Sequence, residues 1–338
     1  MKIGLTEVAA RARVSEATVS RVVNRRPGVS SRTRETVERA IAELGYEPAQ
    51  RGQIVAMITP WISNPFFSEV VELVEAALAP HGLKGVICPA LPRGIQEREF
   101  VAALVDHGIA AVVFLSASNT LDNADTEAYQ ILASRRIPFV GINGGFDGHD
   151  VPVFSSDDLV AAEMAVDHLH GLGHRRIGMA AGPRGNRPAD RRVQGFLAAL
   201  DRRGSTDAAR RVVRQAYTVE GGQAAAATLI EDGATAIVAA SDYMALGAIR
   251  AVRRAGLSVP GDVSVVGYDG SMITEFVDPP LTTVRQPMDR LAKAVAHAVV
   301  ALAGHHEVPT GELLFSPELV VRSSTAPPPD PTHRRQNR

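Results

Sequence analysis

The sequence predicts a small all-α module at the N-terminus, followed by an α/β body with two doubly wound parallel-sheet sub-domains. Three observations lead to this fold class. Residues 1–50 carry apolar side chains at helical spacing. From residue 53 onward, short β-branched runs alternate with helical stretches, which is typical of parallel sheets. This series occurs twice, so we expect two sub-domains with a ligand cleft at the carboxyl ends of their strands.

The N-terminal module is predicted to contain three short helices. Leu5, Val8 and Ala12 share one face of the first helix, over residues 5–12. Ser15 is a good N-cap for the second helix, over 16–24, and Ser30 caps a third that ends before Gly45. The first two helices form a helix-turn-helix, and the third supplies the apolar face that this pair needs.

The body is predicted to alternate strands and helices along its whole length. The expected strands are 54–58, 85–88, 110–115, 139–142, 176–181, 211–216, 235–240 and 263–267. The expected helices lie near 67–80, 94–107, 124–135, 158–172, 189–202, 220–232, 242–255 and 287–303.

These elements define the expected domain boundaries. The module occupies residues 1–48, a linker 49–53, and the body 54–323. The last helix returns the chain to the first sub-domain and residues 313–322 cross back. The first sub-domain is therefore expected at about 54–154 plus 286–312, and the second at 155–285 plus 313–323. Residues 324–338 are proline-rich and polar, so we expect a disordered tail.

Composition limits the class of protein. The 338 residues include one cysteine, which excludes an intramolecular disulfide framework and is typical of the reducing cytoplasm. The sequence has no apolar run long enough to span a membrane and no signal-peptide core. The net charge of −1 combines a basic N-terminal module with a mildly acidic body. This asymmetry favours a polyanionic partner at one end of the chain only.

Specific motifs in the N-terminal module indicate a resemblance to a known family. Its matching residues are Thr18-Val19-Ser20-Arg21-Val22-Val23-Asn24, Val29-Ser30, Thr33-Arg34, Val37 and Leu44-Gly45-Tyr46-Glu47-Pro48. In this register they resemble the headpiece of the lactose-repressor (LacI) family of bacterial transcription regulators. The resemblance continues to about residue 323 through Asn64-Pro65-Phe66-Phe67, Leu172-Gly173-His174-Arg175-Arg176-Ile177, Ala181-Gly182-Pro183, Asp242-Tyr243-Met244-Ala245-Leu246-Gly247-Ala248, Ser264-Val265-Val266-Gly267-Tyr268-Asp269 and Pro279-Pro280-Leu281-Thr282-Thr283-Val284. It implies a periplasmic-binding-protein-like core that binds an effector.

The second helix is expected to enter the DNA major groove by its N-terminus. Arg21 can bond a guanine edge in bidentate fashion, which is worth about 1–3 kcal/mol of discrimination, unless it is simply a solvated arginine. Glu16 either accepts from cytosine N4 or only favours the helix dipole, and Ala17 suits a thymine methyl. The expected phosphate contacts come from Ser15, Thr18, Ser20, Asn24, Ser30, Arg32 and Arg34.

Two departures from the family pattern concern the turn and the linker. Arg13 stands where the turn usually has glycine, so a left-handed backbone there adds about 1 kcal/mol of strain. The linker after Pro48 is about eight residues shorter than the family's linker, so it has no room for the hinge helix and lacks the leucine wedge. We therefore expect little or no central DNA kink, although Arg51 can still enter the minor groove electrostatically.

The resemblance places the effector site on seven residues: Phe66, Asn143, Arg192, Tyr217, Ser241, Asp269 and Gln286. Asp269 and Arg192 can form paired, charge-assisted hydrogen bonds to neighbouring hydroxyls, and aromatic rings can stack on the apolar face of a sugar. Structural roles are the alternatives: Phe66 as a core aromatic and Asp269 as a turn or cap residue. Asn143 and Ser241 stand where sugar-responsive relatives often have Asp and Asn, so the ligand need not be an ordinary hexose.

The sequence therefore predicts a homodimeric, effector-controlled transcriptional regulator, most simply a repressor, that binds a near-palindromic DNA operator. One alternative is a sugar-binding protein whose short linker has weakened operator recognition. A solute-binding protein and a sugar enzyme are disfavoured, because there is no signal peptide and no nucleophile or paired-carboxylate arrangement. We expect no cofactor and no metal site, since His168, His170 and His174 straddle a helix end without cysteine or carboxylate neighbours.

Overall fold

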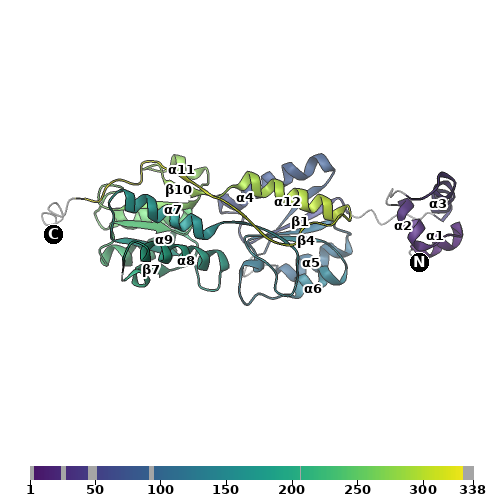
Figure 1. Ribbon diagram of the computed structural model, residues 1–338, viewed down its shortest axis with the longest axis horizontal. Coiled ribbons are helices and arrows are strands. Elements are labelled where there is room, and N and C mark those ends of the chain that lie inside the picture. Colours follow the sequence, from purple (N-terminus) through teal and green to yellow (C-terminus); the bar gives the residue numbers. More distant parts are fainter. Residues whose placement is uncertain (1–3, 24–27, 45–51, 91–94, 206, 330–338) are drawn as a thin grey trace. The chain divides into compact units, whose positions relative to one another are not determined.

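The computed structural model describes residues 4–23, 28–44, 52–90, 95–205 and 207–329. The chain divides into two compact units, Met1–Gln53 and Ile54–Arg338, and each is considered by itself. Figure 1 shows the three helices of the first unit and the two sheets of the second.

The N-terminal unit is a three-helix module. Its helices are α1 (Leu5–Ala12), α2 (Glu16–Val23) and α3 (Ser31–Leu44). Val8, Val19 and Val37 are fully buried against one another at the centre, one from each helix. The described boundaries agree with the predicted ones because the caps and the apolar spacing are local signals.

The first sub-domain of the body is built on a parallel sheet in the order β11-β5-β4-β3-β1-β2. Its strands are β1 (Ile54–Thr59), β2 (Lys84–Pro89), β3 (Ala111–Leu115), β4 (Phe139–Ile142), β5 (Pro152–Ser156) and β11 (Gly311–Phe315). Its helices are α4 (Pro65–Leu78), η1 (Ala79–His81), α5 (Glu97–Asp106), η2 (Ser118–Thr120), α6 (Glu127–Ser134) and α12 (Met288–Ala303). Successive residues of β1 alternate between two apolar clusters, one with α4 and α12 and the other with α5 and α6. Both faces of the central strands β1, β3, β4 and β5 are therefore buried, as is typical of parallel sheets, whereas the edge strands β2 and β11 are largely exposed.

The second sub-domain repeats this plan in the order β12-β10-β9-β8-β6-β7. Its strands are β6 (Ile177–Ala181), β7 (Val212–Arg214), β8 (Ala236–Ala239), β9 (Ser264–Asp269), β10 (Thr282–Arg285) and β12 (Glu318–Val320). Its helices are α7 (Asp158–Gly171), α8 (Arg187–Asp201), η3 (Ala208–Arg211), α9 (Val219–Glu231), α10 (Asp242–Arg254) and α11 (Ile273–Phe276). Only β12 runs antiparallel to its neighbour, β10. The predicted fold class, two doubly wound sheets after a helical module, is confirmed.

The chain passes between the two sheets after β5, after β10 and after β11 (Figure 1). Strands β5 and β11 pair with each other and belong to the first sheet as far as Ser156 and Phe315. The first sub-domain thus extends a few residues beyond the expected crossings at 154 and 312. Asp157 then caps α7 by accepting a hydrogen bond from the Val160 amide.

The expectation of a disordered tail from residue 324 is wrong for residues 324–329. Ser324 is fully buried; its hydroxyl donates to the Val265 carbonyl (2.6 Å) and accepts from the Thr282 amide (2.8 Å). His174 hydrogen-bonds the Ala326 carbonyl (2.8 Å). Polar side-chain bonds therefore hold this segment on the second sheet, and the proline content alone does not reveal them. Residues 330–338 lie outside the described residues.

Candidate functional site

The exposed face of α2 carries the residues predicted to read DNA bases. Glu16, Ala17 and Arg21 are all exposed there. Glu16 also accepts a hydrogen bond from the Thr6 hydroxyl (2.8 Å), so its carboxylate already has one partner within the module. Arg21 has no partner among the described residues. A free guanidinium at this position is suited to an acceptor edge or a phosphate.

The residues predicted to contact phosphates include two that cap helices. Ser15 accepts from the Thr18 amide and Ser30 from the Thr33 amide, each at 3.2 Å. These serines thus fix the starts of α2 and α3, and their hydroxyls can serve both roles. Arg32 is exposed on α3. Asn24, Arg51 and most of the linker lie outside the described residues.

The turn between α1 and α2 has the backbone that was expected to strain a non-glycine residue. Arg13 has φ 54° and ψ 44°, in the left-handed region, and ends α1 as its C-cap residue. A side chain there costs about 1–2 kcal/mol relative to glycine.

A cavity of about 600 Å³ lies in the body of the protein. All of the residues predicted for the effector line it: Phe66, Asn143, Arg192, Tyr217, Ser241, Asp269 and Gln286. Asn143 and Gln286 directly follow β4 and β10, Asp269 is the last residue of β9, and Ser241 caps α10 shortly after β8. Phe66 and Arg192 lie near the starts of helices α4 and α8. Both sub-domains thus contribute, which is the arrangement that ligand sites in open parallel sheets favour.

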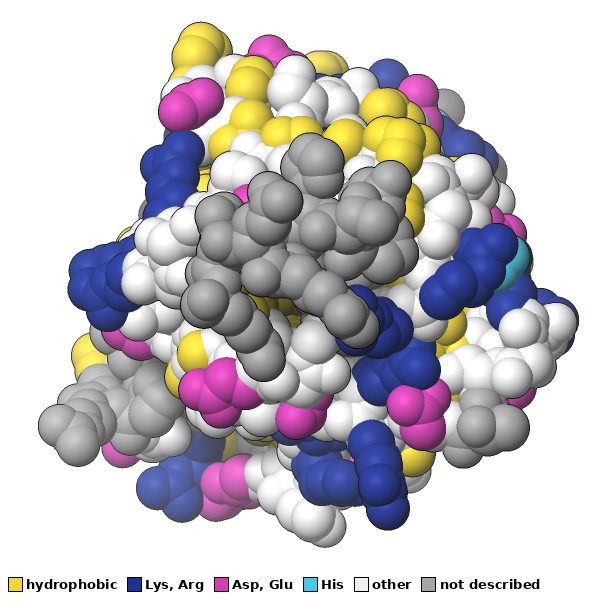
Figure 2. Space-filling view, turned by 90° about the vertical axis from the view of Figure 1, so that its left-hand side faces the viewer, with side chains coloured by type: hydrophobic (Ala, Val, Ile, Leu, Met, Phe, Trp, Pro, Cys, Tyr) yellow, Lys and Arg dark blue, Asp and Glu magenta, His cyan; other side chains and the backbone are white. Residues whose placement is uncertain are grey.

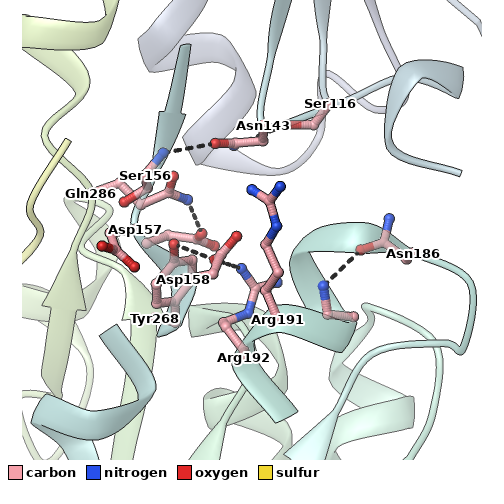
Figure 3. A network of polar contacts seen from close by, with 12 residues as sticks. Ser116, Asn143, Ser156, Asp157, Asp158, Asn186, Arg191, Arg192, Tyr268 and Gln286 are labelled. Carbon is pink, nitrogen blue, oxygen red and sulfur yellow. Dashed lines mark hydrogen bonds and ion pairs between the residues drawn. The ribbon is translucent and has the colours of Figure 1, made fainter. Parts of the chain in front are cut away.

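A buried ionic network orients Arg192 at the wall of the cavity (Figure 3). Its guanidinium donates to the Asp158 carboxylate (2.5 Å) and to the Tyr217 hydroxyl (2.6 Å), and lies 4.3 Å from the centre of the Tyr268 ring. Tyr268 donates to the same carboxylate oxygen (2.8 Å). The Nε of Arg192 is buried without a partner. A buried, unpaired donor at a cavity wall is satisfied most simply by a ligand acceptor.

Asp269 and Gln286 form the second polar group of the cavity. Gln286 donates to the Asp269 carboxylate (2.9 Å), while its own carbonyl oxygen is buried and unpaired. Burial raises the pKa of Asp269, and the nearby Asp242 carboxylate raises it further. Burial likewise raises the pKa of Asp242 to about 6, against hydrogen bonds from Thr283 and Ser271. A ligand hydroxyl near Asp269 would replace lost solvation and favour its charged form.

Three residues at the cavity have positive φ without being glycine. They are Ser116 (50°), Asn143 (62°) and Asp269 (122°). The Asn143 amide donates to the Ser116 hydroxyl (3.1 Å) and its oxygen accepts from the Ser156 amide (3.1 Å) (Figure 3). Backbone strain of this kind persists where surrounding contacts enforce it and is concentrated at functional sites.

Sequence reasoning missed a second group of lining residues, which includes Trp61, Glu97 and Ser118. Glu97 is half-buried and accepts from the Ser118 amide (2.8 Å) and the Ser118 hydroxyl. Burial raises the pKa of its carboxyl. The family motifs do not include these positions, although Trp61, the one tryptophan of the chain, lies shortly after the predicted strand 54–58.

Polar contacts join the two sub-domains beside the cavity. Arg187 of α8 donates to Asp147 (2.8 Å) and to the Gly145 carbonyl (3.3 Å), and lies 3.6 Å from Asp122. Tyr243 of α10 donates to the Ser63 carbonyl (2.5 Å). The acceptors belong to the first sub-domain and the donors to the second, so these contacts hold the cavity closed.

Two of the three histidines that could have indicated a metal site have other side-chain partners. His174 is buried and bonds Thr235 (2.9 Å) and Ser264 (3.1 Å), while His168 bonds Thr325 (3.0 Å). No cluster of potential metal ligands occurs in the part of the chain that the structure describes. Within that part, no helix is both long and apolar enough to span a membrane.

Comparison with known proteins agrees with this geometry. Residues 4–49 match the bacterial regulatory proteins of the lacI family, and residues 166–325 match the periplasmic binding protein-like domain. The HTH-type transcriptional regulator MalR of Streptomyces coelicolor is 43% identical over 338 residues, covering 97% of this chain and 98% of the relative. The chain belongs to the LacI family. It is a DNA-binding transcriptional regulator with a periplasmic-binding-protein-like core.

Solved structures resemble this LacI-family regulator over nearly its whole length. A complex of the transcriptional regulator CelR with cellobiose matches with a TM-score of 0.73 and 33% identity, covering 95% of this chain and 99% of that one. A lac repressor dimer bound to operator and the anti-inducer ONPF matches with a TM-score of 0.71 and 28% identity, covering 96% and 100%.

Proposed function

We propose that this LacI-family regulator binds a sugar in its cavity and, as a homodimer in the cytoplasm, represses transcription from a near-palindromic operator. The observation that carries the effector class is the pair of unsatisfied buried groups, Arg192 Nε and Gln286 Oε1, beside the Asp269 carboxylate. One donor, one acceptor and one carboxylate suit the adjacent hydroxyls of a sugar. The cellobiose complex of the related CelR supports this class.

A homodimer is supported by the lac repressor dimer and by the surface of the second sub-domain. Met272 and Phe276, in and beside α11, have 67% and 78% of their surface exposed. Figure 2 shows apolar side chains gathered along the upper edge of this end, where α11 lies in Figure 1, while charged side chains are interspersed below. Apolar groups this exposed are suited to burial against a second copy.

Operator recognition is proposed to depend on Arg21, with Glu16 and Ala17 beside it. Full-length protein is incubated with random duplex DNA, and the bound sequences are selected and read. We expect a symmetric site that is lost in Arg21→Ala and retained in Arg39→Ala, a matched change on exposed α3. The half-site spacing also tests the short linker. If only salt-sensitive, non-specific binding is found, operator recognition is refuted and the sugar-binding alternative gains support.

Effector control is tested on the selected operator. Adding a sugar that binds the cavity should change operator affinity, and operator DNA should change sugar affinity by the same factor, because linkage is reciprocal. Arg192→Gln should abolish the response, since it removes the guanidinium that faces the ligand. An unchanged sugar response in this variant would place the effector elsewhere.

A further inference from the structure

The cavity has a second polar wall that the sugar site around Arg192 and Asp269 does not use. This wall comes from Trp61 after β1, Glu97 at the start of α5, and Ser118 in η2. All three belong to the first sub-domain, whereas Arg192 and Asp269 belong to the second. A cavity of about 600 Å³ lies within the range that holds molecules of drug size, which is more room than one sugar ring fills.

The Glu97 carboxylate has acceptor capacity that the protein leaves unused. A carboxylate offers about four acceptor positions, and Ser118 takes two of them through its amide and hydroxyl. No lysine or arginine among the described residues forms an ion pair with Glu97. A half-buried carboxylate without a cation partner is costly unless further donors satisfy it. Since Glu97 lines the cavity, ligand hydroxyls are the donors within reach.

Trp61 supplies the apolar complement to this carboxylate. Its ring lines the cavity, is only partly exposed and stacks on no other aromatic ring among the described residues. A large flat apolar surface beside hydrogen-bonding groups is the combination that orients small polar ligands in protein sites.

We propose that Trp61, Glu97 and Ser118 form a second subsite, which takes the second ring of a disaccharide effector whose first ring lies at Arg192 and Asp269. This inference rests on the proposed sugar effector and deepens it: the chain selects two-ring over one-ring saccharides. The carboxylate binds two ring hydroxyls while the indole covers the apolar face of the ring.

Calorimetric titration of the full-length protein with glucose, maltose and cellobiose tests the subsite. Wild type should bind one of the disaccharides more tightly than glucose. Glu97→Gln should weaken the affinity for that disaccharide by about tenfold or more, because a charge-assisted hydrogen bond is lost, and it should leave the affinity for glucose nearly unchanged. Trp61→Ala should give the same pattern. The matched control is Glu163→Gln, which removes a carboxylate paired with Arg202; neither residue lines the cavity, so this variant should change the affinity for neither glucose nor the disaccharide.

The outcomes separate this subsite from the proposed function. Equal affinity for glucose and both disaccharides, or equal weakening of all sugars by Glu97→Gln, would overturn the subsite and leave the sugar effector standing. Failure of wild type to bind any of the three would overturn both. A normal circular dichroism spectrum for each variant excludes misfolding as the cause.

Discussion

Arg187→Ala should weaken effector binding although Arg187 does not line the cavity. Its guanidinium joins the second sub-domain to Asp147, Asp122 and the Gly145 carbonyl of the first. The two carboxylates are mostly exposed, so the ion pairs contribute about 0.2–1 kcal/mol together. The hydrogen bond to Gly145 adds about 0.5–1.5 kcal/mol. Losing a total of about 1–2 kcal/mol reduces the ratio of closed to open molecules by about five- to thirtyfold, and it lowers the apparent affinity by up to that factor.

The affinity is measured by titrating cellobiose and maltose, with the fluorescence of the single Trp61 as the signal. Arg202→Ala is the matched control, because it removes a similarly exposed pair with Glu163 inside the second sub-domain. High salt should narrow the difference between wild type and Arg187→Ala, since exposed ion pairs are screened. Equal sugar affinities for Arg187→Ala and Arg202→Ala would refute the argument that the Arg187 contacts govern closure.

Three further predictions concern stability. Arg13→Gly should stabilise the N-terminal module by about 0.5–1 kcal/mol, because the relief of left-handed strain exceeds the entropic cost of glycine. Hydrogen exchange of the module measures this change, and the control Arg39→Gly, in the interior of α3, should destabilise the module instead. Ser324→Ala should lower the unfolding free energy of the body in urea by about 1–3 kcal/mol, since two buried backbone groups lose their partner, while the exposed Ser323→Ala should have no effect. Burial lowers the pKa of His174 below its ordinary 6.5. The contribution of this neutral histidine to folding stability is therefore intact above pH 6.5, and it is lost as the pH falls from 6.5 through the pKa of His174 in the folded protein. On acidification below pH 6.5, the melting temperature of wild type should therefore fall more than that of His174→Gln. Buried carboxyls with a raised pKa, such as Asp242, gain stability on acidification, so the effect of the histidine is seen only in the difference between the two proteins. Parallel melting curves for the two proteins would contradict the assignment.

The sequence predicts the elements with strong local signals. The caps Ser15 and Ser30 and the apolar spacing of the first three helices locate α1, α2 and α3 almost to the residue. Alternating strands and helices identify the two parallel sheets. The family resemblance, rather than the pattern, identifies the cavity residues, because side chains from both sub-domains meet only after folding.

What the sequence could not predict depends on long-range contacts. The predicted strands do not include β5, β10, β11 or β12, because each has only three to five residues and little local pattern distinguishes it from a turn or a crossing segment. The order of segment 324–329 depends on Ser324 reaching Val265 and Thr282 across the sheet. Glu97 and Ser118 lie at opposite ends of a segment that contains α5 and β3, so nothing local indicates their hydrogen bonds or their place at the cavity.

The contacts that close the cavity have a strength suited to a ligand-controlled switch. Beside the cavity they are partly exposed ion pairs and single hydrogen bonds, each worth between about 0.2 and 1.5 kcal/mol. A much stronger interface would keep the sub-domains closed with or without effector, and a ligand with equal affinity for both states shifts nothing. A ligand supplies the difference when it contacts both sub-domains, for example Arg192 of the second and Asn143 of the first, because only the closed form brings these lining residues around it. Effector binding therefore favours the closed form by the free energy of the ligand contacts that only this form can make. Because the contacts between the sub-domains are weak, a modest free energy of this kind is enough to shift the equilibrium.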